Sequence, residues 1–355
     1  MKNKNSLIKN SIFVVVLLIV ILVVIFSIND FSKIVENLKN LKLEYLFYSL
    51  GITILYLLTW SCSLFFILRK YKSKMNKTDL FLVSNSDLFF NGITPFSTGG
   101  QPFQVYALSR GKMKASDATT AVMGKMIVYQ VAIIIVSTFA LFISYNKVAN
   151  STKNFIILVF IGYFMNLFVL LFLLLTSTCK WFKRLIMKLF NLVGKIKFLK
   201  EKMENKKDGF ENYLSDFQSS FKSLFKHPLT LLLSLSFQIL NLIFMFAVPY
   251  FLLRGMGISS SNNFNLLIYV ISLVALNSAF MCWLPTPGAS GGAEFGLQTL
   301  LLTISSVNSG IALIVMLLWR FFTYYVTIVY GFISYLILER KIRKIEYNEN
   351  ISIEK

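Results

Sequence analysis

The sequence predicts an all-α polytopic membrane protein in which two inverted repeats each contain a broken-helix re-entrant hairpin. Hydrophobic residues make up 56% of the chain and charged residues 15%, and the mean hydropathy is +0.66. These values lie outside the usual balance of a soluble domain. Long apolar segments and a short motif that occurs twice are the other two observations behind the prediction.

Six segments are each long enough to cross a bilayer core, which takes about 20 apolar residues per helix. They are residues 12–28, 45–68, 118–145, 154–177, 229–253 and 310–338. The first follows Lys2, Lys4 and Lys9 as in a signal peptide, but no small-residue cleavage site comes after it. We therefore expect a retained anchor, followed at 32–42 by a short interfacial helix on the outer side.

Lysine and arginine predict the orientation, because they concentrate in the cytoplasmic loops of membrane proteins. The formal net charge is +20, and the cations gather at the N-terminus and at 69–77, 180–207 and 339–344. We expect these regions, and hence both termini, to be cytoplasmic. The charge indicates topology and contact with anionic headgroups, and we expect no nucleic-acid partner.

The basic segment 179–203 alternates apolar and cationic residues at near-helical spacing, for example Trp181 and Leu185 with Lys183 and Lys188. Such a pattern is typical of a helix that lies on a membrane surface. A solvated connector with positive-inside charges explains the same pattern. Both interpretations remain open at this point.

Cysteine and histidine give no pattern for chemistry. Cys62, Cys179 and Cys282 are scattered without a CxxC pair, and the single histidine, His227, precedes Pro228 at the expected start of a helix. The sequence also contains no Walker loop, GxSxG elbow or HExxH motif. We therefore predict no metal site, no cofactor and no catalytic residue.

A motif of the form T-P-x-x-[ST]-G-G-x-x-F occurs twice in the chain. The first copy, TPFSTGGQPF, begins at Thr94, and the second, TPGASGGAEF, begins 192 residues later at Thr286. At the same offset, Asn85-Ser86 aligns with Asn277-Ser278, which extends the match beyond the motif. The sequence therefore contains an internal duplication.

The predicted topology inverts one copy relative to the other. The span before the first copy ends inside at Arg69, whereas the span before the second begins inside after Lys226. Inverted repeats with broken helices are typical of secondary transporters. We expect one hairpin at 79–113 from the cytoplasm and another at 264–306 from outside. The transmembrane domain, 1–344, then divides into repeat 1 (about 43–177), a cytoplasmic amphipathic connector (178–228) and repeat 2 (about 229–338), before a short cytoplasmic tail (345–355).

Broken backbone at membrane depth is tolerated only where it is buried in protein or lines a water-filled cavity. Each break precedes a new half-helix, for which Thr98 and Ser290 are suitable N-caps. Free N–H groups and the positive end of the helix dipole attract anions, and glycine allows close approach. The motif therefore predicts a phosphate site, with close packing of the two hairpin tips as the alternative.

Ionisable residues within spans are costly in lipid and are functional candidates. Arg320 lies about ten residues, or roughly 15 Å, into the last span and so near the midplane. Lys125 takes a similar place after the first motif, although there it is close enough to the helix end to extend toward the surface. Asp87 comes just before the first motif and Glu294 just after the second Gly-Gly, and these acids either neutralise the cations or bind a ligand.

The predicted lipid-headgroup site combines these four charged residues with motif positions. The motif positions are Thr94, Ser97, Thr98, Gly99, Gly100, Gln101, Thr286, Ser290, Gly291 and Gly292. In this hypothesis the headgroup phosphate enters a central polar cavity while the acyl chains stay in the lipid. The two inverted halves then rock to expose the cavity to one leaflet or the other.

The segments NGITPFSTGGQPFQVYALSRGKM and LPTPGASGGAEFG, with their spacing and surrounding spans, resemble the lysylphosphatidylglycerol synthase transmembrane region, or flippase-like domain. That region is the membrane half of the bacterial multiple peptide resistance factor, and the resemblance covers roughly residues 10–338. It implies a protein of the bacterial cytoplasmic membrane that moves aminoacylated phosphatidylglycerol between leaflets. In bifunctional relatives, a separate C-terminal domain makes this lipid from lysyl-tRNA.

After the last span only ERKIRKIEYNENISIEK follows, which is too short for a synthase domain of usual size. We therefore expect no enzymatic activity from these residues, even where the family label phosphatidylglycerol lysyltransferase is attached to such a chain. A separately encoded synthase is a candidate partner.

Our leading hypothesis is a translocator of an anionic or aminoacylated phospholipid such as lysylphosphatidylglycerol, which would contribute to resistance to cationic peptide antibiotics. One alternative is a component that works with a separate phosphatidylglycerol lysyltransferase. Others are a transporter of polyprenyl-linked glycolipids or small solutes, an enzyme that uses Glu294 as general acid or base, and a scaffold that recruits a soluble partner through 180–207. The sequence makes no prediction of oligomeric state.

Overall fold

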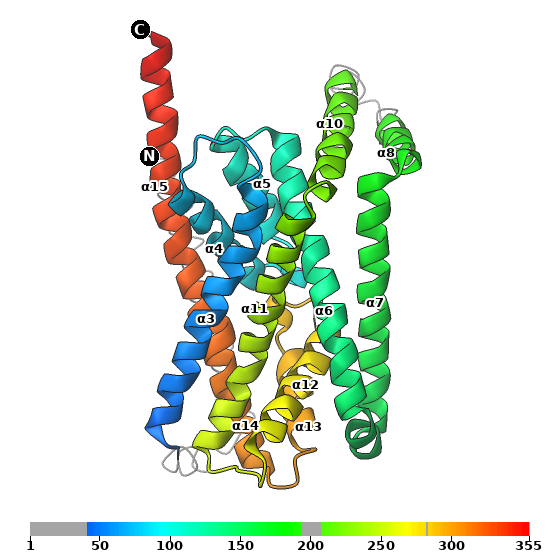
Figure 1. Ribbon diagram of the computed structural model, residues 1–355, viewed down its shortest axis with the longest axis vertical. Helices are drawn as coiled ribbons and strands as arrows, with labels where there is room; N and C mark the ends of the chain where they lie inside the picture. The colour runs from blue at the N-terminus through cyan, green and yellow to red at the C-terminus, as the bar shows by residue number, and fades with distance from the viewer. Residues whose placement is uncertain (1–40, 194–206, 282, 355) are drawn as a thin grey trace.

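The computed structural model describes residues 41–193, 207–281 and 283–354, and every regular element in them is helical (Figure 1). The predicted anchor at 12–28 lies outside the described residues. So does the predicted interfacial helix at 32–42, apart from its last two residues.

Twelve α-helices make up most of the described chain. They are α3 (Leu43–Leu68), α4 (Lys77–Ile93), α5 (Gly100–Arg110), α6 (Ala115–Ser151), α7 (Lys153–Thr178), α8 (Lys180–Val193), α10 (Lys207–Phe225), α11 (Pro228–Gly255), α12 (Asn263–Met281), α13 (Gly292–Leu301), α14 (Ser309–Arg320) and α15 (Val326–Glu354). Three short segments connect some of them, namely the 3-10 turns η1 (Pro95–Ser97) and η2 (Pro287–Ala289) and the π-helical segment η3 (Phe321–Tyr325).

The predicted spans within the described residues are confirmed as long apolar helices. They correspond to α3, α6, α7, α11 and the continuous helix formed by α14, η3 and α15. α12 is also long and apolar enough to cross a membrane, and it forms the first arm of the hairpin predicted at 264–306. The chain is therefore a polytopic all-α membrane protein.

α3 and α11 form the most extensively packed pair of helices among the described residues. The amide of Lys42 donates to the carbonyl of Gly255 at 3.0 Å, so the start of α3 lies beside the end of α11. Midway along, the Asn241 side chain donates to the Tyr56 carbonyl at 2.7 Å. Interhelical hydrogen bonds of this kind stabilise helix pairs in lipid, where no hydrophobic effect drives one apolar helix against another.

The hairpins pack across the two halves of the molecule. α4 of the first half lies along α15 of the second, and α12 of the second half lies along α6 of the first. Gly331 makes the former contact close, because a Cβ atom there would lie 2.5 Å from the Phe89 backbone nitrogen. The Asn85 side chain also donates to the Tyr330 hydroxyl at 2.8 Å. The two repeats are therefore interlocked.

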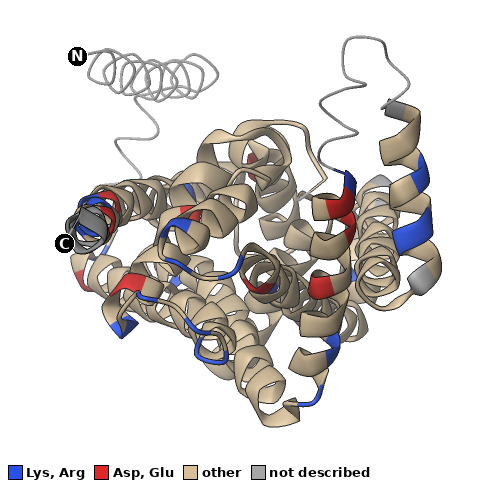
Figure 2. Ribbon diagram, turned by 90° about the horizontal axis from the view of Figure 1, so that it is seen from above, with Lys and Arg blue, Asp and Glu red and all other residues tan. Residues whose placement is uncertain are grey.

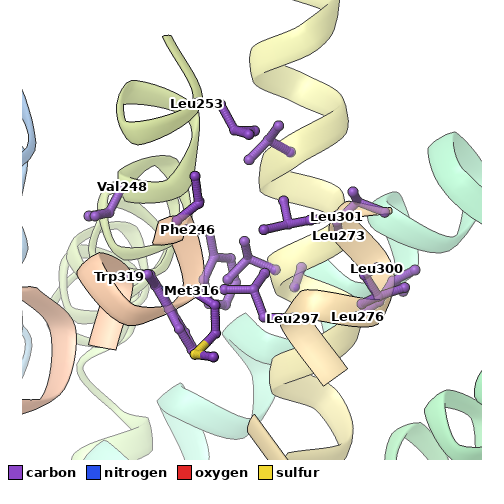
Figure 3. Packing of buried hydrophobic residues seen from close by; sticks show 14 of the residues in the cluster. Phe246, Val248, Leu253, Leu273, Leu276, Leu297, Leu300, Leu301, Met316 and Trp319 are labelled. Atoms are coloured by element: carbon purple, nitrogen blue, oxygen red, sulfur yellow. The ribbon is translucent and has the colours of Figure 1, made fainter. Parts of the chain in front are cut away.

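An apolar cluster joins α11, α12, α13 and α14 (Figure 3). Trp319, Phe246, Leu273 and Leu297 belong to it and have at most 2% of their surface exposed. In a bilayer such contacts stabilise through close packing and dispersion. The cluster fixes α13 and α14 relative to each other, and these are the helices that carry Glu294 and Arg320.

Cations gather at one end of the bundle, which is uppermost in Figure 1 and which we call the basic end. It contains α8, α10, the turn between α5 and α6, and the C-terminal part of α15. Seen from this end, α8 lies across the view at the right edge of the bundle (Figure 2). Its Trp181 and Leu189 side chains are exposed. This placement, roughly parallel to a membrane plane, favours the surface-helix interpretation of the basic segment.

Candidate functional site

The two copies of the duplicated motif share an unusual backbone at the two residues that follow the proline. In hairpin 1, formed by α4, η1 and α5, the two residues after the proline have positive φ angles, 54° at Phe96 and 51° at Ser97. In hairpin 2, formed by α12, η2 and α13, Gly288 and Ala289 at the equivalent positions have φ angles of 59° and 57°. The duplication therefore extends from sequence to backbone conformation.

The tips of the two hairpins meet inside the bundle. η1 contacts η2, and α4 also contacts η2. Tyr324 lies between them, since its hydroxyl donates to the Gly92 carbonyl of hairpin 1 at 2.9 Å. In hairpin 2, a Cβ atom at Gly288 would lie 2.0 Å from the Tyr324 ring. Close packing of the tips, given above as the alternative role of the motif, is thus a feature of the structure.

Side chains accept hydrogen bonds from several of the backbone amides that we predicted to bind an anion. In hairpin 1, the Gly99 amide donates to the Thr94 hydroxyl and the Gly100 amide donates to the Asn91 side chain, each at 2.9 Å. In hairpin 2, the Gly291 amide donates to the Glu294 carboxylate at 2.7 Å. An anion would have to displace these acceptors to bind the same amides.

The two predicted N-caps are wrong. The Thr98 hydroxyl donates to the Pro95 carbonyl at 3.1 Å, and the Ser290 hydroxyl donates to the Pro287 carbonyl at 2.9 Å. Each of these side chains closes the 3-10 turn before it, because that turn directs a carbonyl toward it. The new helices begin instead after the glycines, with Gly99 and Gly291 as the capping residues.

Arg320 and Glu294 form an ion pair beside the tip of hairpin 2. The Arg320 Nε lies 2.6 Å from a Glu294 carboxylate oxygen, and its Nη2 donates to the Gly288 carbonyl at 3.0 Å. The guanidinium also lies over the Trp319 and Tyr324 rings. The Arg320 side chain is 5% exposed, whereas that of Glu294 is 18% exposed.

Lys125 and Asp87 form a second ion pair, which involves hairpin 1. The Lys125 Nζ lies 3.1 Å from one Asp87 carboxylate oxygen, and the Trp60 indole donates to the other at 2.9 Å. The Lys125 ammonium also lies 3.6 Å from the centre of the Trp60 ring, in a cation–π contact. Both charged side chains are almost fully buried, with only 3% of Asp87 exposed.

The structure thus assigns an acidic partner to each predicted cation, one pair to each hairpin. The remaining motif positions serve the turns. The Thr286 hydroxyl donates to the Ser290 carbonyl at 2.9 Å, and Leu284 packs where a side chain at Gly292 would be. Ser97 and Gln101 are half-buried in hairpin 1, and Ser97 donates its amide to the Thr94 carbonyl.

Sequence reasoning missed Trp60, Asn91 and Tyr324. Asn91 lies within the stretch that breaks the helix, where asparagine commonly bonds nearby backbone, and this was an available signal. Trp60 and Tyr324 are aromatic residues in apolar spans, where such residues are most often ordinary packing. Their polar atoms were the remaining clue, because buried N–H and O–H groups require partners. Among the described residues no group of three potential metal ligands occurs, so the site is a set of ion pairs and hydrogen bonds.

Two comparisons with known proteins bear on this site. The family of the lysylphosphatidylglycerol synthase transmembrane region matches residues 11–331. This range includes both hairpins and both buried ion pairs. A search of curated proteins finds no match to the chain.

Proposed function

Because the chain belongs to the family of the lysylphosphatidylglycerol synthase transmembrane region, we propose that it moves an anionic or aminoacylated phospholipid between the leaflets of the bacterial cytoplasmic membrane. In this proposal the basic end is cytoplasmic, as the distribution of lysine and arginine favours. The lipid itself is made by a separate synthase, and the transported lipid contributes to resistance to cationic peptides.

The ion pair of Arg320 and Glu294 is the observation that carries the proposal. It lies where the hairpin tips meet, and its carboxylate is partly exposed beside the exposed Gly291. A lipid phosphate matches the guanidinium in charge and geometry, because arginine binds phosphate with paired hydrogen bonds. The ammonium of a lysyl headgroup matches the carboxylate.

Exchange of partners keeps the buried charges compensated at every stage. Separating a buried ion pair without replacement leaves a charge unpaired, which costs about 3–5 kcal/mol. A headgroup that carries both a phosphate and an ammonium replaces each partner as the pair opens. The pair therefore favours a lipid with both charges over one with neither, and this is the basis for placing lysylphosphatidylglycerol first among the substrates.

The ion pair of Lys125 and Asp87 provides an equivalent headgroup-binding site in the other half. Inverted repeats that meet near the midplane allow a ligand to be passed between sites that open to opposite sides. In the proposed cycle, the headgroup first opens the partly exposed pair in hairpin 2. Rocking of the interlocked halves then brings it toward the closed pair in hairpin 1.

Leaflet exchange in proteoliposomes tests the proposal. Labelled phosphatidylglycerol, its lysyl derivative and a polyprenyl-phosphate sugar are compared with wild-type, Arg320→Gln and Arg254→Gln protein. Arg254 is a matched control because its guanidinium bonds Asn263 near the other end of the bundle and away from the hairpin tips. We expect Arg320→Gln to slow exchange at least tenfold and Arg254→Gln to leave it unchanged.

Equal rates in all three proteins would remove Arg320 from the mechanism. Conversion of the lipid into another species, detected by chromatography of the same samples, would show that the protein is an enzyme and not a translocator.

A further inference from the structure

An apolar groove lies between α6, α10 and α11, and no member of either ion pair lines it. Its volume is about 160 Å³, and its lining includes Gly124 of α6, Phe221 and Phe225 of α10, and Leu232 and Leu235 of α11. All of the side chains that line it are apolar. A cavity of comparable size, about 150 Å³ and lined by similar side chains, stays dry and binds small hydrocarbons.

The groove opens on the outer surface of the bundle. Leu232 at its edge is 59% exposed, and Leu229 and Leu240 of the same helix are also exposed. A helix that spans a bilayer presents such residues to lipid. The medium outside the groove is therefore acyl chain, and hydrocarbon is the material that fills an apolar groove there at least cost.

Cations lie close to one end of the groove. Lys222 and Lys226 are exposed and are the direct sequence neighbours of Phe221 and Phe225, which line it. Lys226 lies in the turn between α10 and α11, and Leu232 is the fifth residue of α11. α10 lies at the basic end, and after its Phe225 end α11 runs away from that end of the bundle (Figure 1). The two lysines and the apolar groove thus follow each other in the same order as the headgroup and acyl chain of a phospholipid whose headgroup faces the basic end.

We propose that this groove is a binding site for an anionic phospholipid of the leaflet at the basic end. One acyl chain lies in the groove, and the headgroup phosphate bonds Lys222 and Lys226. Cations beside a membrane surface attract anionic headgroups, so two cations give a preference over zwitterionic lipid. The site is separate from the hairpin tips and does not depend on transport.

Lipid retention on the purified full-length protein tests the groove. Wild-type, Leu232→Trp and Leu240→Trp proteins are equilibrated in micelles with equal amounts of phosphatidylglycerol and phosphatidylcholine, and bound lipid is counted by native mass spectrometry. Leu240 is the matched control, because it is exposed on the same helix but does not line the groove. We expect Leu232→Trp to lower retention of phosphatidylglycerol at least fivefold and Leu240→Trp to leave it unchanged.

Substitution of both lysines tests the headgroup contact. Lys222→Gln combined with Lys226→Gln should reduce the preference for phosphatidylglycerol until the two lipids are retained almost equally. Retention that is the same in the Leu232→Trp and Leu240→Trp proteins, or a lipid preference that survives loss of both lysines, would overturn the proposal.

A fluorescence measurement exchanges one aromatic ring of the lining for another and so covers the case in which Leu232→Trp fails to fold. A tryptophan is placed at Phe225, and the added emission, relative to wild type, is quenched with lipids that carry brominated chains. We expect brominated phosphatidylglycerol to quench it at least twice as strongly as brominated phosphatidylcholine. Equal quenching would contradict the site.

Discussion

The two hairpins share one backbone turn but place their acidic residue on opposite sides of it. Asp87 comes before the break in hairpin 1, where each of its carboxylate oxygens has a side-chain partner. Glu294 comes after the break in hairpin 2, where it bonds both Arg320 and the Gly291 amide. Only 3% of the Asp87 side chain is exposed, against 18% of Glu294. The duplication therefore preserved the turn while the charges diverged.

The hairpins also differ in how their far ends are held. Hairpin 1 is tied to α15 at the basic end, where Arg110 bonds both Glu339 and Glu346 and Lys341 pairs with Asp79. The hydrogen bond with Glu346 raises the pKa of Arg110. Hairpin 2 instead relies on the apolar cluster of Figure 3. We infer that hairpin 1 is the fixed partner and that a ligand first meets hairpin 2.

Loss of one member of the fully buried pair should have the largest effect on stability. Lys125→Met leaves the Asp87 charge with only the Trp60 indole, and we expect it to lower the free energy of unfolding by about 3–5 kcal/mol. Arg320→Met should cost less, about 1–3 kcal/mol, because Glu294 is partly exposed and keeps its bond to Gly291. Thermal unfolding in detergent measures both.

The double variant Lys125→Met with Asp87→Leu is the control for this prediction. Apolar replacement of a whole buried pair is often nearly neutral, so the double variant should recover most of the lost stability. If the single and double variants were equally unstable, packing rather than charge would explain the loss.

A side chain at the tip of hairpin 2 should have the next largest effect. Gly288→Ala combines a left-handed residue, at about 1–2 kcal/mol, with overpacking against Tyr324, at about 1–3 kcal/mol. Gly257→Ala separates the two terms, because its φ is 81° but nothing lies within 4 Å of the added atom. Thermal unfolding should show a loss of about 2–5 kcal/mol for Gly288→Ala, and clearly less for Gly257→Ala. Equal losses of stability in the two variants would mean that the Tyr324 ring moves aside without an energetic cost.

Release of hairpin 1 from α15 should have a smaller and more local effect. Arg110→Gln removes the bonds to two carboxylates that are partly exposed, which we expect to cost about 1–2 kcal/mol. Hydrogen exchange of the α5 amides should become faster, and high salt should reduce the difference from wild type. Arg343→Gln, at a far more exposed pair with Glu339, is the control and should leave α5 unchanged. Equal exchange in both variants would show that ion pairs do not hold hairpin 1.

The smallest expected effect is a gain in stability at the tip of hairpin 1. Phe96 is half-exposed and has a left-handed backbone, so Phe96→Gly relieves strain but adds chain entropy to the unfolded state. The net gain should be about 1 kcal/mol or less, seen as a slightly higher melting temperature. A loss of more than that amount would show that the Phe96 ring makes contacts worth more than the strain.

Much of this arrangement follows from local sequence. Apolar length predicts the spans, the two motifs predict the breaks, and the positions of cations predict that the copies are inverted. Neutralisation of Arg320 and Lys125 by Asp87 and Glu294 was one of the two expectations for these residues, because unpaired charges are costly in a span. Which acid pairs with which cation was not predicted. The family was also predicted, and the match over residues 11–331 confirms it.

The choice of hydrogen-bond partners could not be predicted in the same way. Thr98 has the spacing of an N-cap, yet Thr94 and Asn91 bond the glycine amides because the left-handed residues fold the chain back onto the end of α4. Trp60 bonds Asp87 only because α3 packs against α4. Such contacts depend on tertiary structure, which residue spacing does not encode.

Interlocking of the halves has a consequence for how the chain is made. Hairpin 1 completes its packing against α15, and the bonded residues Asn85 and Tyr330 are 245 positions apart. At about 5–20 residues per second, the ribosome takes about 10–50 s to synthesise that length of chain. During this interval the Asn85 side chain of α4 is in the membrane without its Tyr330 partner. Biosynthesis thus includes a waiting stage, in which the insertion machinery has to shield the first hairpin until the last helix arrives.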